Sequence, residues 1–232
     1  MVWVCGVDGF KSEWCAVLKR LDTCEFLPIV VSFRDLLTHS ENPKIIAVDL
    51  PIGLPEVAMP GGRRCDRLAR DLLGWRRARS VFSPVGRRAL EAKTRPEADQ
   101  INRDKGGIGI GAQAWGIAKK LREVDALMTT DRQEVIREVH PEVSFAEMIG
   151  APPIHGKKTP AGKEERIAAL IERGFPAWFV RAMPNCPRVA QDDFLDACAA
   201  LWTAERIYRG TAKRIPPDSD HDERGLDMAI WI

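Results

Sequence analysis

The sequence predicts a single domain with a mixed α/β fold. Strand-like segments occupy residues 2–31, a fully apolar segment follows shortly after them, and helical patterns dominate the second half of the chain. The chain has 232 residues, of which 45% are hydrophobic. That is enough to enclose one well-buried core, and nothing in this length requires a second domain. We therefore expect residues 1–232 to form one domain, with helices flanking a mixed central sheet.

The N-terminal strands are predicted to form an antiparallel meander. The segments VWVCGVD, WCAVLKR and EFLPIVV are rich in β-branched and aromatic residues, and turn-forming residues separate them. A short helix is expected at residues 32–37, with Ser32 as its N-cap and Asp35 at the capping-box position. The apolar run KIIAVDLPIGL then indicates a strand that is buried on both faces of a sheet.

The middle of the chain is predicted to be basic and helical. Residues 61–105 are dense in arginine and contain few strand signals, so we expect a basic, mostly helical insertion at about residues 55–110. Apolar residues then recur at mostly three- and four-residue spacing between Gly111 and Met128, which predicts one amphipathic helix. The segment EVIREVH is expected to be a further strand.

The last third of the chain is predicted to contain two helices. The segment PEVSFAEMIG leads into a proline-bearing loop, and KEERIAALIERGF indicates a helix that is stopped by Gly174. A longer helix is expected from about Gln191 to Tyr208, and its Asp193 and Asp196 are neighbours because they are three residues apart. The segment LDMAIWI is a candidate for a terminal edge strand.

The composition favours a cytoplasmic protein. Its net charge of +2 is nearly neutral, so attraction to nucleic acid would have to come from a local concentration of charge. The six cysteines include no CxxC pair, and we expect reduced, buried thiols. No basic segment followed by a short apolar stretch stands at the N-terminus, and no apolar run is long enough to span a bilayer. We therefore expect a cytoplasmic location and no membrane partner.

Acidic residues stand where a metal site would need them. Asp8 ends the apolar run MVWVCGVD, and Asp49 ends KIIAVD. An aspartate at the end of a buried strand loses hydration, which a cation, a hydrogen-bond network or catalysis must compensate. The candidate metal ligands are Asp8, Asp49, Glu138, Glu142, Asp193 and Asp196. Because hard ions prefer carboxylate oxygens, the expected cofactor is Mg²⁺ or Mn²⁺.

These carboxylates fit a site that hydrolyses phosphodiesters with two divalent ions. Such a pair of ions neutralises charge on the attacking and leaving oxygens. We expect Asp8 to bridge both ions, because the first strand lies in the middle of such a sheet. Asp49 would hold one ion, and Asp193 and Asp196 would hold or order the other.

Glu138 and Glu142 compete for the remaining acidic role. Strand alternation puts Glu138 and His140 on one face, whereas Glu142 follows Pro141 into a loop. We favour Glu142 for the metal cleft, with His140 as a proton shuttle near neutral pH. The candidate catalytic residues are Asp8, Asp49, His140, Glu142 and Asp193.

Each of these residues also has a purely structural interpretation. Asp193 can stabilise the start of a helix, where it meets the positive end of the dipole. Asp49 can accept backbone hydrogen bonds in a turn, and Asp8 can be an ordinary turn residue before a glycine. His140 can be a hydrogen-bonded structural histidine. The metal hypothesis depends on convergence, because four unrelated segments would otherwise each need a separate explanation.

The basic residues of the middle segment have two interpretations. They could hold a phosphate backbone while Trp75 and Phe82 stack on exposed bases, which is the interpretation that we favour. Alternatively, Asp66 and Asp71 pair with them on a solvated helix face. The candidate nucleic-acid-binding residues, which include two lysines of a later loop, are Arg63, Arg64, Arg67, Arg70, Arg76, Arg77, Lys157 and Lys158.

Five segments of the chain carry a resemblance to a known family. They are GVDGFKSEWCAV, IAVDLPIGLP, EVHPEVSF, GKKTPAGKEER and DDFLDACAALWTA. In this order and spacing, they resemble the family of unknown function number 429, whose members are predicted ribonuclease H-like nucleases. The resemblance implies a ribonuclease H-like fold, with Asp8 on the first strand and Asp49 on the fourth. It also implies nuclease activity.

Three classes of function are compatible with the sequence. The first is a metal-dependent nuclease acting on nucleic acid, which would lose activity in Asp8→Asn. The second is a non-catalytic nucleic-acid- or protein-binding domain on the same fold, which would not depend on Asp8. The third is a nucleotide-binding phosphotransferase of the actin-like or sugar kinase type. We rank it last, because the sequence contains no second phosphate-binding repeat and is short for two lobes.

Overall fold

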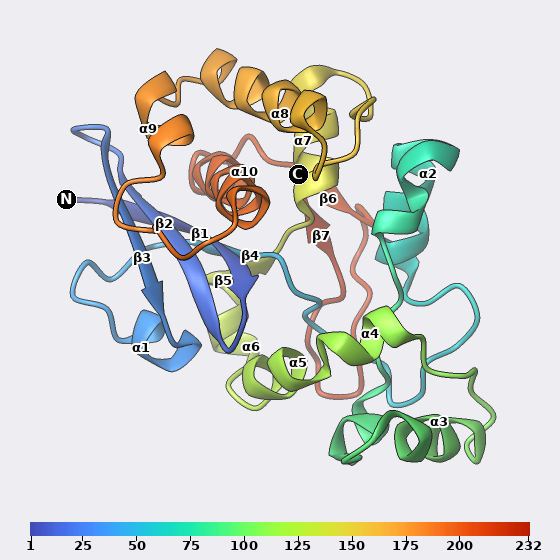
Figure 1. Ribbon diagram of the computed structural model, residues 1–232. Coiled ribbons are helices and arrows are strands. Elements are labelled where there is room, and N and C mark those ends of the chain that lie inside the picture. Colours follow the sequence, from blue (N-terminus) through green and yellow to red (C-terminus); the bar gives the residue numbers. More distant parts are fainter.

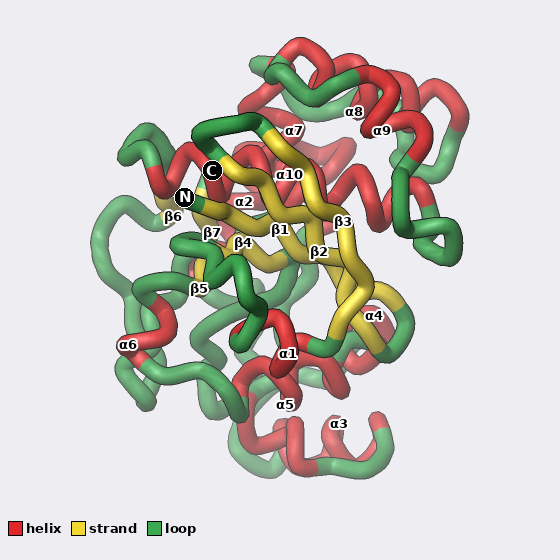
Figure 2. The backbone as a smooth tube through the Cα atoms, turned by 90° about the vertical axis from the view of Figure 1, so that its left-hand side faces the viewer, coloured by secondary structure: helices red, strands yellow, loops and turns green.

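A five-stranded mixed sheet forms the centre of the protein (Figure 2). The structure is a computed structural model and describes all 232 residues. The antiparallel meander consists of β1 (Trp3–Phe10), β2 (Glu13–Arg20) and β3 (Glu25–Val31). β4 (Ile46–Val48) lies parallel to β1, and β5 (Ile136–Glu138) lies parallel to β4. The order is β3-β2-β1-β4-β5, so β1 is the middle strand and the expected α/β class is confirmed.

Helices cover both faces of this sheet (Figure 1). One face carries α7 (Pro141–Ile149), α8 (Pro160–Glu172), α9 (Ala177–Ala182) and α10 (Gln191–Tyr208). The other face packs against α1 (Phe33–Leu37), α3 (Arg95–Arg103), α4 (Ala112–Gly116) and α5 (Ala118–Asp125). Because both faces are buried, β4 is apolar on both sides, as its sequence predicted.

Gly6 allows α10 to lie directly on β1. A Cβ atom at this position would collide with the backbone of α10 at Ala197 and Leu201. The facing part of α10 is rich in alanine and is completely buried around Cys198. This close approach holds the N-terminal half of α10 against the strand segment that carries Asp8.

The segment between β4 and β5 contains several helices. α2 (Arg64–Arg77) is kinked at Gly74, where φ is 61°. Short 3₁₀ helices follow at Ala78–Ser80 and Arg87–Glu91, and α6 (Thr130–Gln133) precedes β5. Residues of α2 pack with Val143 of α7 in a small hydrophobic cluster. The basic segment is therefore anchored to the rest of the molecule.

Two helical predictions differ from the structure. Residues 111–128 form two short helices rather than one, because the chain leaves helical geometry at Ile117, directly after Gly116. The segment from Pro141 onward is the helix α7 rather than the start of a loop. Proline suits this first helical position, because its missing N–H would be unpaired there in any case. α9 had no counterpart among the sequence predictions.

Two strand predictions also need correction. β5 covers only Ile136–Glu138, which is shorter than the predicted strand EVIREVH. The C-terminal residues form β7 (Ile230–Trp231), which pairs with β6 (Arg214–Ile215) in a separate two-stranded sheet. A single bridge links Trp231 to Val139 next to the main sheet.

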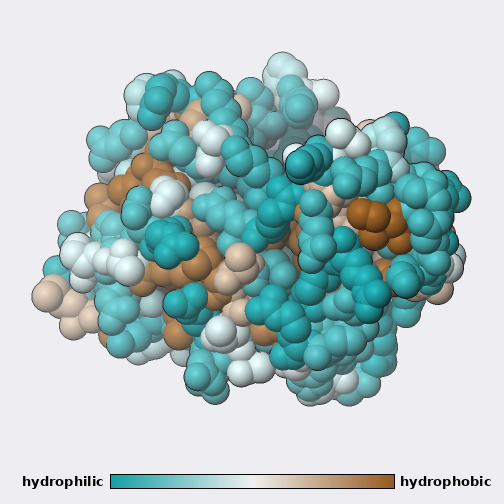
Figure 3. All heavy atoms as spheres, turned by 90° about the horizontal axis from the view of Figure 1, so that it is seen from below, coloured by the Kyte–Doolittle hydropathy of each residue, from teal (hydrophilic) through white to brown (hydrophobic).

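The surface seen from below is largely hydrophilic (Figure 3). Hydrophobic atoms show as patches, the larger ones on the left, where α1 and β3 lie in Figure 1. None of the helices combines the length and the apolar content that a membrane crossing needs.

Candidate functional site

The pairing of β1 with β4 brings two aspartates side by side. The parallel register runs from Cys5 opposite Ile46 to Val7 opposite Val48. One further step places Asp8 beside Asp49, and the backbone N–H of Asp49 donates to the carbonyl of Val7. Because side chains alternate along a strand, both carboxylates point to the face that α10 covers. Asp8 lies within β1, which continues to Phe10, so it is not the last residue of its strand.

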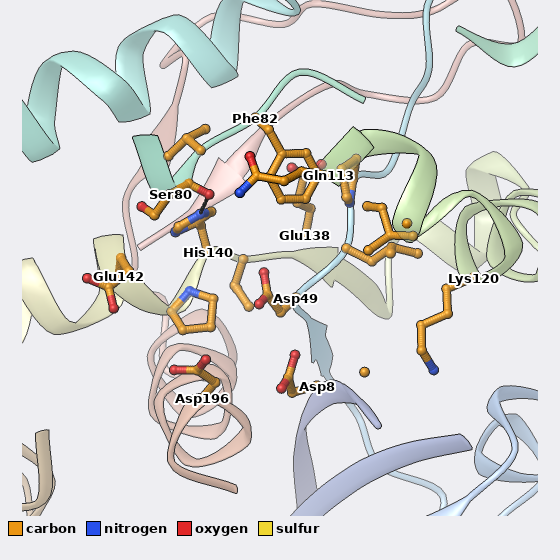
Figure 4. A pocket seen from close by; sticks show the side chains of 18 of the residues that line it. Asp8, Asp49, Ser80, Phe82, Gln113, Lys120, Glu138, His140, Glu142 and Asp196 are labelled. Atoms are coloured by element: carbon orange, nitrogen blue, oxygen red, sulfur yellow. Dashed lines mark hydrogen bonds between the residues drawn. The ribbon is translucent and has the colours of Figure 1, made fainter. Parts of the chain in front are cut away.

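Two helices add further carboxylates to this pair. Asp196 lies on α10 one turn from its start and is 1% exposed. Glu142 lies in the first turn of α7 and is 6% exposed. Figure 4 shows Asp8, Asp49 and Asp196 close together, with Glu142 further along the same side. We call Asp8, Asp49, Glu142 and Asp196 the open cluster.

The open cluster has few cations in contact with it. The Nζ atom of Lys157 lies 2.6 Å from Oδ2 of Asp196, and the buried guanidinium of Arg166 bonds to Oε1 of Glu142. Asp8 and Asp49 make no ion pair. The buried oxygens Oδ1 of Asp196 and Oε2 of Glu142 have no hydrogen-bond partner. Buried carboxylate oxygens without a partner are costly, so this set of groups is short of positive charge.

Burial and mutual repulsion raise the pKa values of the three aspartates. For Asp8, loss of hydration is the largest cause, and the charges of Asp49 and Asp196 add to it. Burial also raises the pKa of Asp49, although His140 and Lys157 oppose this change. Burial raises the pKa of Asp196 to about 7, against the opposing effect of Lys157. A divalent cation would relieve this arrangement, because an opposite charge favours the ionised form.

A cavity of about 660 Å³ opens directly above the open cluster. All four carboxylates of the cluster line it, together with His140. Its wall also contains several cationic side chains, namely Lys11, Arg77, Arg79, Lys119, Lys120 and Lys157. Acidic and basic side chains therefore line the same cavity. Such a cavity suits a metal-bound anion such as a phosphate.

Glu138 belongs to a different and fully paired cluster. In β5 it is paired with Val48 in register, so it points to the sheet face opposite to that of Asp8 and Asp49. Arg63 donates to both oxygens of Glu138, at 2.6 and 2.7 Å, and the backbone N–H of Ile52 donates to Oε2 at 2.7 Å. Arg63 also donates to Asp66 at 2.6 Å. We call Arg63, Asp66 and Glu138 the closed cluster.

The closed cluster is a poor place for a metal ion, although Cys65, Asp66 and Glu138 have ligand atoms close to one another. The guanidinium of Arg63 already lies between the two carboxylates. Burial raises the pKa of the Cys65 thiol, so it does not supply the thiolate that a metal requires. Glu138 therefore pairs with Arg63 instead of facing the open cluster, and Glu142, the residue that we favoured, lies in the open cluster.

His140 lies at the N-terminus of α7 and lines the cavity. Its Nε2 is 3.3 Å from the carbonyl oxygen of Ser80, which can only accept, so Nε2–H is the donor. The buried Nδ1 has no partner. In the neutral ring, Nδ1 therefore carries the lone pair and can accept a proton.

Asp193 lies apart from the cavity wall. It is half-buried in the first turn of α10, next to Asp192. Burial raises its pKa, and Asp192 adds to this effect. Its position agrees with the interpretation of a residue that stabilises the start of a helix.

The predicted phosphate-binding residues are separated by the structure. Arg77 and Lys157 line the cavity. Arg63 is buried in the closed cluster, so it is corrected from a phosphate-binding candidate to a structural residue. Arg70 donates to the carbonyls of Val81 and Gly61 and is likewise used within the fold. The candidates that lie outside the cavity lining and have more exposed side chains are Arg64, Arg67, Arg76 and Lys158.

Sequence reasoning missed several residues of the cavity wall, namely Lys11, Gln113, Lys119 and Lys120. Lys11 follows Asp8 by three residues in the turn after β1, so its proximity to Asp8 was a usable signal. The other three come from α4 and α5, which are distant in sequence from every candidate carboxylate. Only the packing of these helices against the sheet brings them to the site.

The protein thus has a mixed α/β fold. Carboxylates from two neighbouring parallel strands and from two helices line one cavity. Over residues 6–221 the chain matches the family described as "Protein of unknown function (DUF429)", and it belongs to this family. The match includes all four residues of the open cluster. No curated protein and no solved structure matches the chain.

Proposed function

We propose that this protein is a metal-dependent nuclease that hydrolyses phosphodiester bonds of nucleic acid, with Mg²⁺ or Mn²⁺ held by the open cluster. One observation carries the proposal. Two buried carboxylate oxygens, on Asp196 and Glu142, lack a hydrogen-bond partner beside the aspartate pair Asp8 and Asp49. Carboxylate oxygens are the ligands that these hard ions prefer, so the residues present fit the metal.

The topology of the sheet supports a more specific fold assignment. We infer a ribonuclease H-like fold, because an antiparallel meander is followed by a helix and by a strand parallel to β1. The two strands that carry Asp8 and Asp49 are then the first and the fourth, as the family resemblance implies. The order of the strands, with β1 in the middle, supports the same assignment.

The residues of the chain would divide the work of catalysis. Asp8, Asp49 and Asp196 would hold the cations, with Glu142 completing the set. When bound, the cations would neutralise the charge that develops on the attacking and leaving oxygens of the phosphodiester. His140 would accept a proton at Nδ1, because its Nε2 is held by the carbonyl of Ser80.

The cationic residues of the wall would orient the substrate. Arg77 and Lys157 stand close to the open cluster, and Nε of Arg77 lies 4.0 Å from Oε2 of Glu142. Their charges would attract the phosphate chain and hold the phosphates next to the scissile one. Lys157 also partly neutralises Asp196 while no divalent cation is bound.

Calorimetric titration with Mn²⁺ tests the proposal, using the wild type and Asp8→Asn. Cleavage of labelled RNA, DNA and hybrid strands by the same two proteins completes the test. We expect saturable binding in the wild type and loss of both binding and cleavage in the variant. Asp66→Asn, in the closed cluster, is the control for general damage and should retain Mn²⁺ binding. If neither protein binds Mn²⁺ even with substrate present, the protein is a non-catalytic binding domain on the same fold.

A further inference from the structure

The cavity wall opposite the open cluster has a chemistry that phosphate recognition does not explain. Phe82 and Gln113 both line the cavity, and Figure 4 draws them in its upper part, with Asp8 and Asp196 below. Phe82 belongs to the connection between the two 3₁₀ helices, and Gln113 lies on α4. An aromatic ring and an amide in the lining of one cavity are suited to a planar, hydrogen-bonding group such as a nucleobase.

Packing against the hydrophobic core holds Phe82 in place. Its half-buried side chain packs against the larger hydrophobic cluster, and it also lines the cavity. A ring fixed in this way offers a rigid surface for stacking at little cost in side-chain entropy. The exposed amide of Gln113 can both donate and accept hydrogen bonds, as the edge of a base requires.

The size of the cavity limits what can reach the carboxylates. Its volume of about 660 Å³ is in the range of pockets that hold single small ligands, which is roughly 300–1,000 Å³. Residues of α4 and of the segment after α2 line the cavity together with the carboxylates, so separate parts of the chain bound the site. A nucleotide that is stacked and paired in a duplex would have to leave the stack before it could enter.

We infer that the cavity takes one unpaired nucleotide, with its base against Phe82 and within reach of Gln113 and its phosphate toward the open cluster. Lys11, Arg79 and Lys119 then meet the neighbouring phosphates at the rim of the cavity. This inference rests on the proposed function, because it names the substrate of the same site. The nucleotide belongs either to a single-stranded segment or to a free mononucleotide.

Fluorescence anisotropy tests the inference, with Ca²⁺ in place of Mg²⁺ so that binding is measured without turnover. The probes are a short labelled single strand, the duplex of the same sequence, and an unlabelled mononucleotide as competitor. Unpairing a base costs a few kcal/mol, so we expect the single strand to bind at least roughly tenfold more tightly than the duplex. Displacement by micromolar mononucleotide identifies the free nucleotide as the ligand, and binding without displacement identifies the strand.

Variants at Phe82 make the test specific. Phe82→Leu keeps apolar packing against the core but removes the aromatic face, and it should weaken single-strand binding about fivefold or more. Phe82→Tyr should bind nearly as the wild type does. Trp178→Ala removes an aromatic side chain that is 64% exposed on α9, away from the cavity, and should leave binding unchanged. Equal affinity for duplex and single strand, or no effect of Phe82→Leu, overturns the inference.

Cleavage in Mn²⁺ separates this inference from the proposed function. If single strands bind through Phe82 but no substrate is cleaved, the nuclease proposal fails and the nucleotide site stands. If duplex is cleaved as well as single strand and Phe82→Leu leaves kcat/KM unchanged, the nuclease proposal stands and the nucleotide site fails.

Discussion

The open and closed clusters lie on opposite faces of the central sheet. They differ in how the charges of their carboxylates are balanced. In the closed cluster, Arg63 donates to Asp66 and to both oxygens of Glu138, and its pKa is held well above the ordinary value by these partners despite burial. In the open cluster, Asp8 and Asp49 have no ion pair, and two buried oxygens have no hydrogen-bond partner. The two carboxylates of the closed cluster thus share one arginine, whereas two carboxylates of the open cluster have no cation in contact.

Under the proposed function, this difference separates structural acids from functional ones. Both clusters are acidic, buried and adjacent to the cavity, so neither burial nor residue type distinguishes them. The two clusters differ in how many of their carboxylates contact a cationic side chain. A stable fold retains buried carboxylates without a cationic partner mainly where a ligand or a reaction compensates for their cost.

The largest effect is expected from removing the cation of the closed cluster. Arg63→Met leaves Asp66 and Glu138 buried without a cationic partner, and the free energy of unfolding should fall by about 3–5 kcal/mol. Urea denaturation measures this loss. Adding Glu138→Gln to the variant should recover part of the stability, and an unchanged midpoint for Arg63→Met would mean that the closed cluster does not hold the fold.

The second prediction concerns the pH dependence of the open cluster in the presence of a chelator. The pKa of Asp196 rises to about 7 on folding, so the native state binds this proton more tightly than the unfolded state does. Stability from this group is therefore complete below a pH of about 4 and is lost as the pH rises through about 7. Relative to Asp196→Asn, the wild type should lose up to roughly 4 kcal/mol between these limits.

Burial also raises the pKa of Glu138 to about 7, so the closed cluster contributes a loss of the same sign. Urea titrations at pH 5 and pH 8, with and without Mn²⁺, separate the two contributions. Mn²⁺ should restore only the part that belongs to the open cluster, because Arg63 occupies the closed one. A loss that Mn²⁺ leaves untouched would assign the whole effect to Glu138.

A third prediction compares one neutral substitution in each cluster. Asp8→Asn removes a charge that burial and the neighbouring aspartates disfavour, so it should raise the stability of the metal-free protein at neutral pH. Asp66→Asn should lower it, because it takes a partner from buried Arg63. Thermal denaturation with and without Mn²⁺ completes the comparison. The gain of about 2.7 kcal/mol at a hundredfold excess over Kd should vanish only in Asp8→Asn.

The smallest effect is expected at Lys157. Its side chain is 38% exposed, so solvent screens its pairing with Asp196, and Lys157→Met should cost only about 1 kcal/mol without metal. The same variant should bind Mn²⁺ more tightly by calorimetry, because a competing cation is gone. Lys158→Met changes an exposed neighbour that makes no ion pair at the site, and it should alter neither quantity. Weaker Mn²⁺ binding in Lys157→Met would contradict this account.

Local sequence signals predicted much of the secondary structure. The helix from Gln191 to Tyr208 has the predicted bounds, because its apolar stripe and the glycine that follows are properties of adjacent residues. The single helix over residues 111–128 was wrong, because the spacing of apolar residues continues across the break at Ile117. Periodicity reports which residues are apolar and not where the backbone turns.

The sequence predicted only part of the candidate site, because local patterns do not show which distant residues come together. Asp8 and Asp49 follow apolar runs, so the sequence singled them out before their pairing was known. Glu138 and Glu142 could not be separated, because the choice depends on the register of β5 and on α7 beginning at Pro141. Arg63 had the same sequence signal as its exposed neighbours, and only packing made it a buried partner of Glu138.

Sequence patterns were enough to predict the α/β class, the N-terminal meander, the longest helix and the acidic residues at the ends of apolar runs. Each of these depends on residues that are near one another in the chain. The tertiary structure alone decided which carboxylates share the open cluster, which arginine closes the other cluster, and that Phe82 and Gln113 face the same cavity. These outcomes depend on strand register and helix packing, which bring distant residues within a few ångströms and which local patterns do not encode.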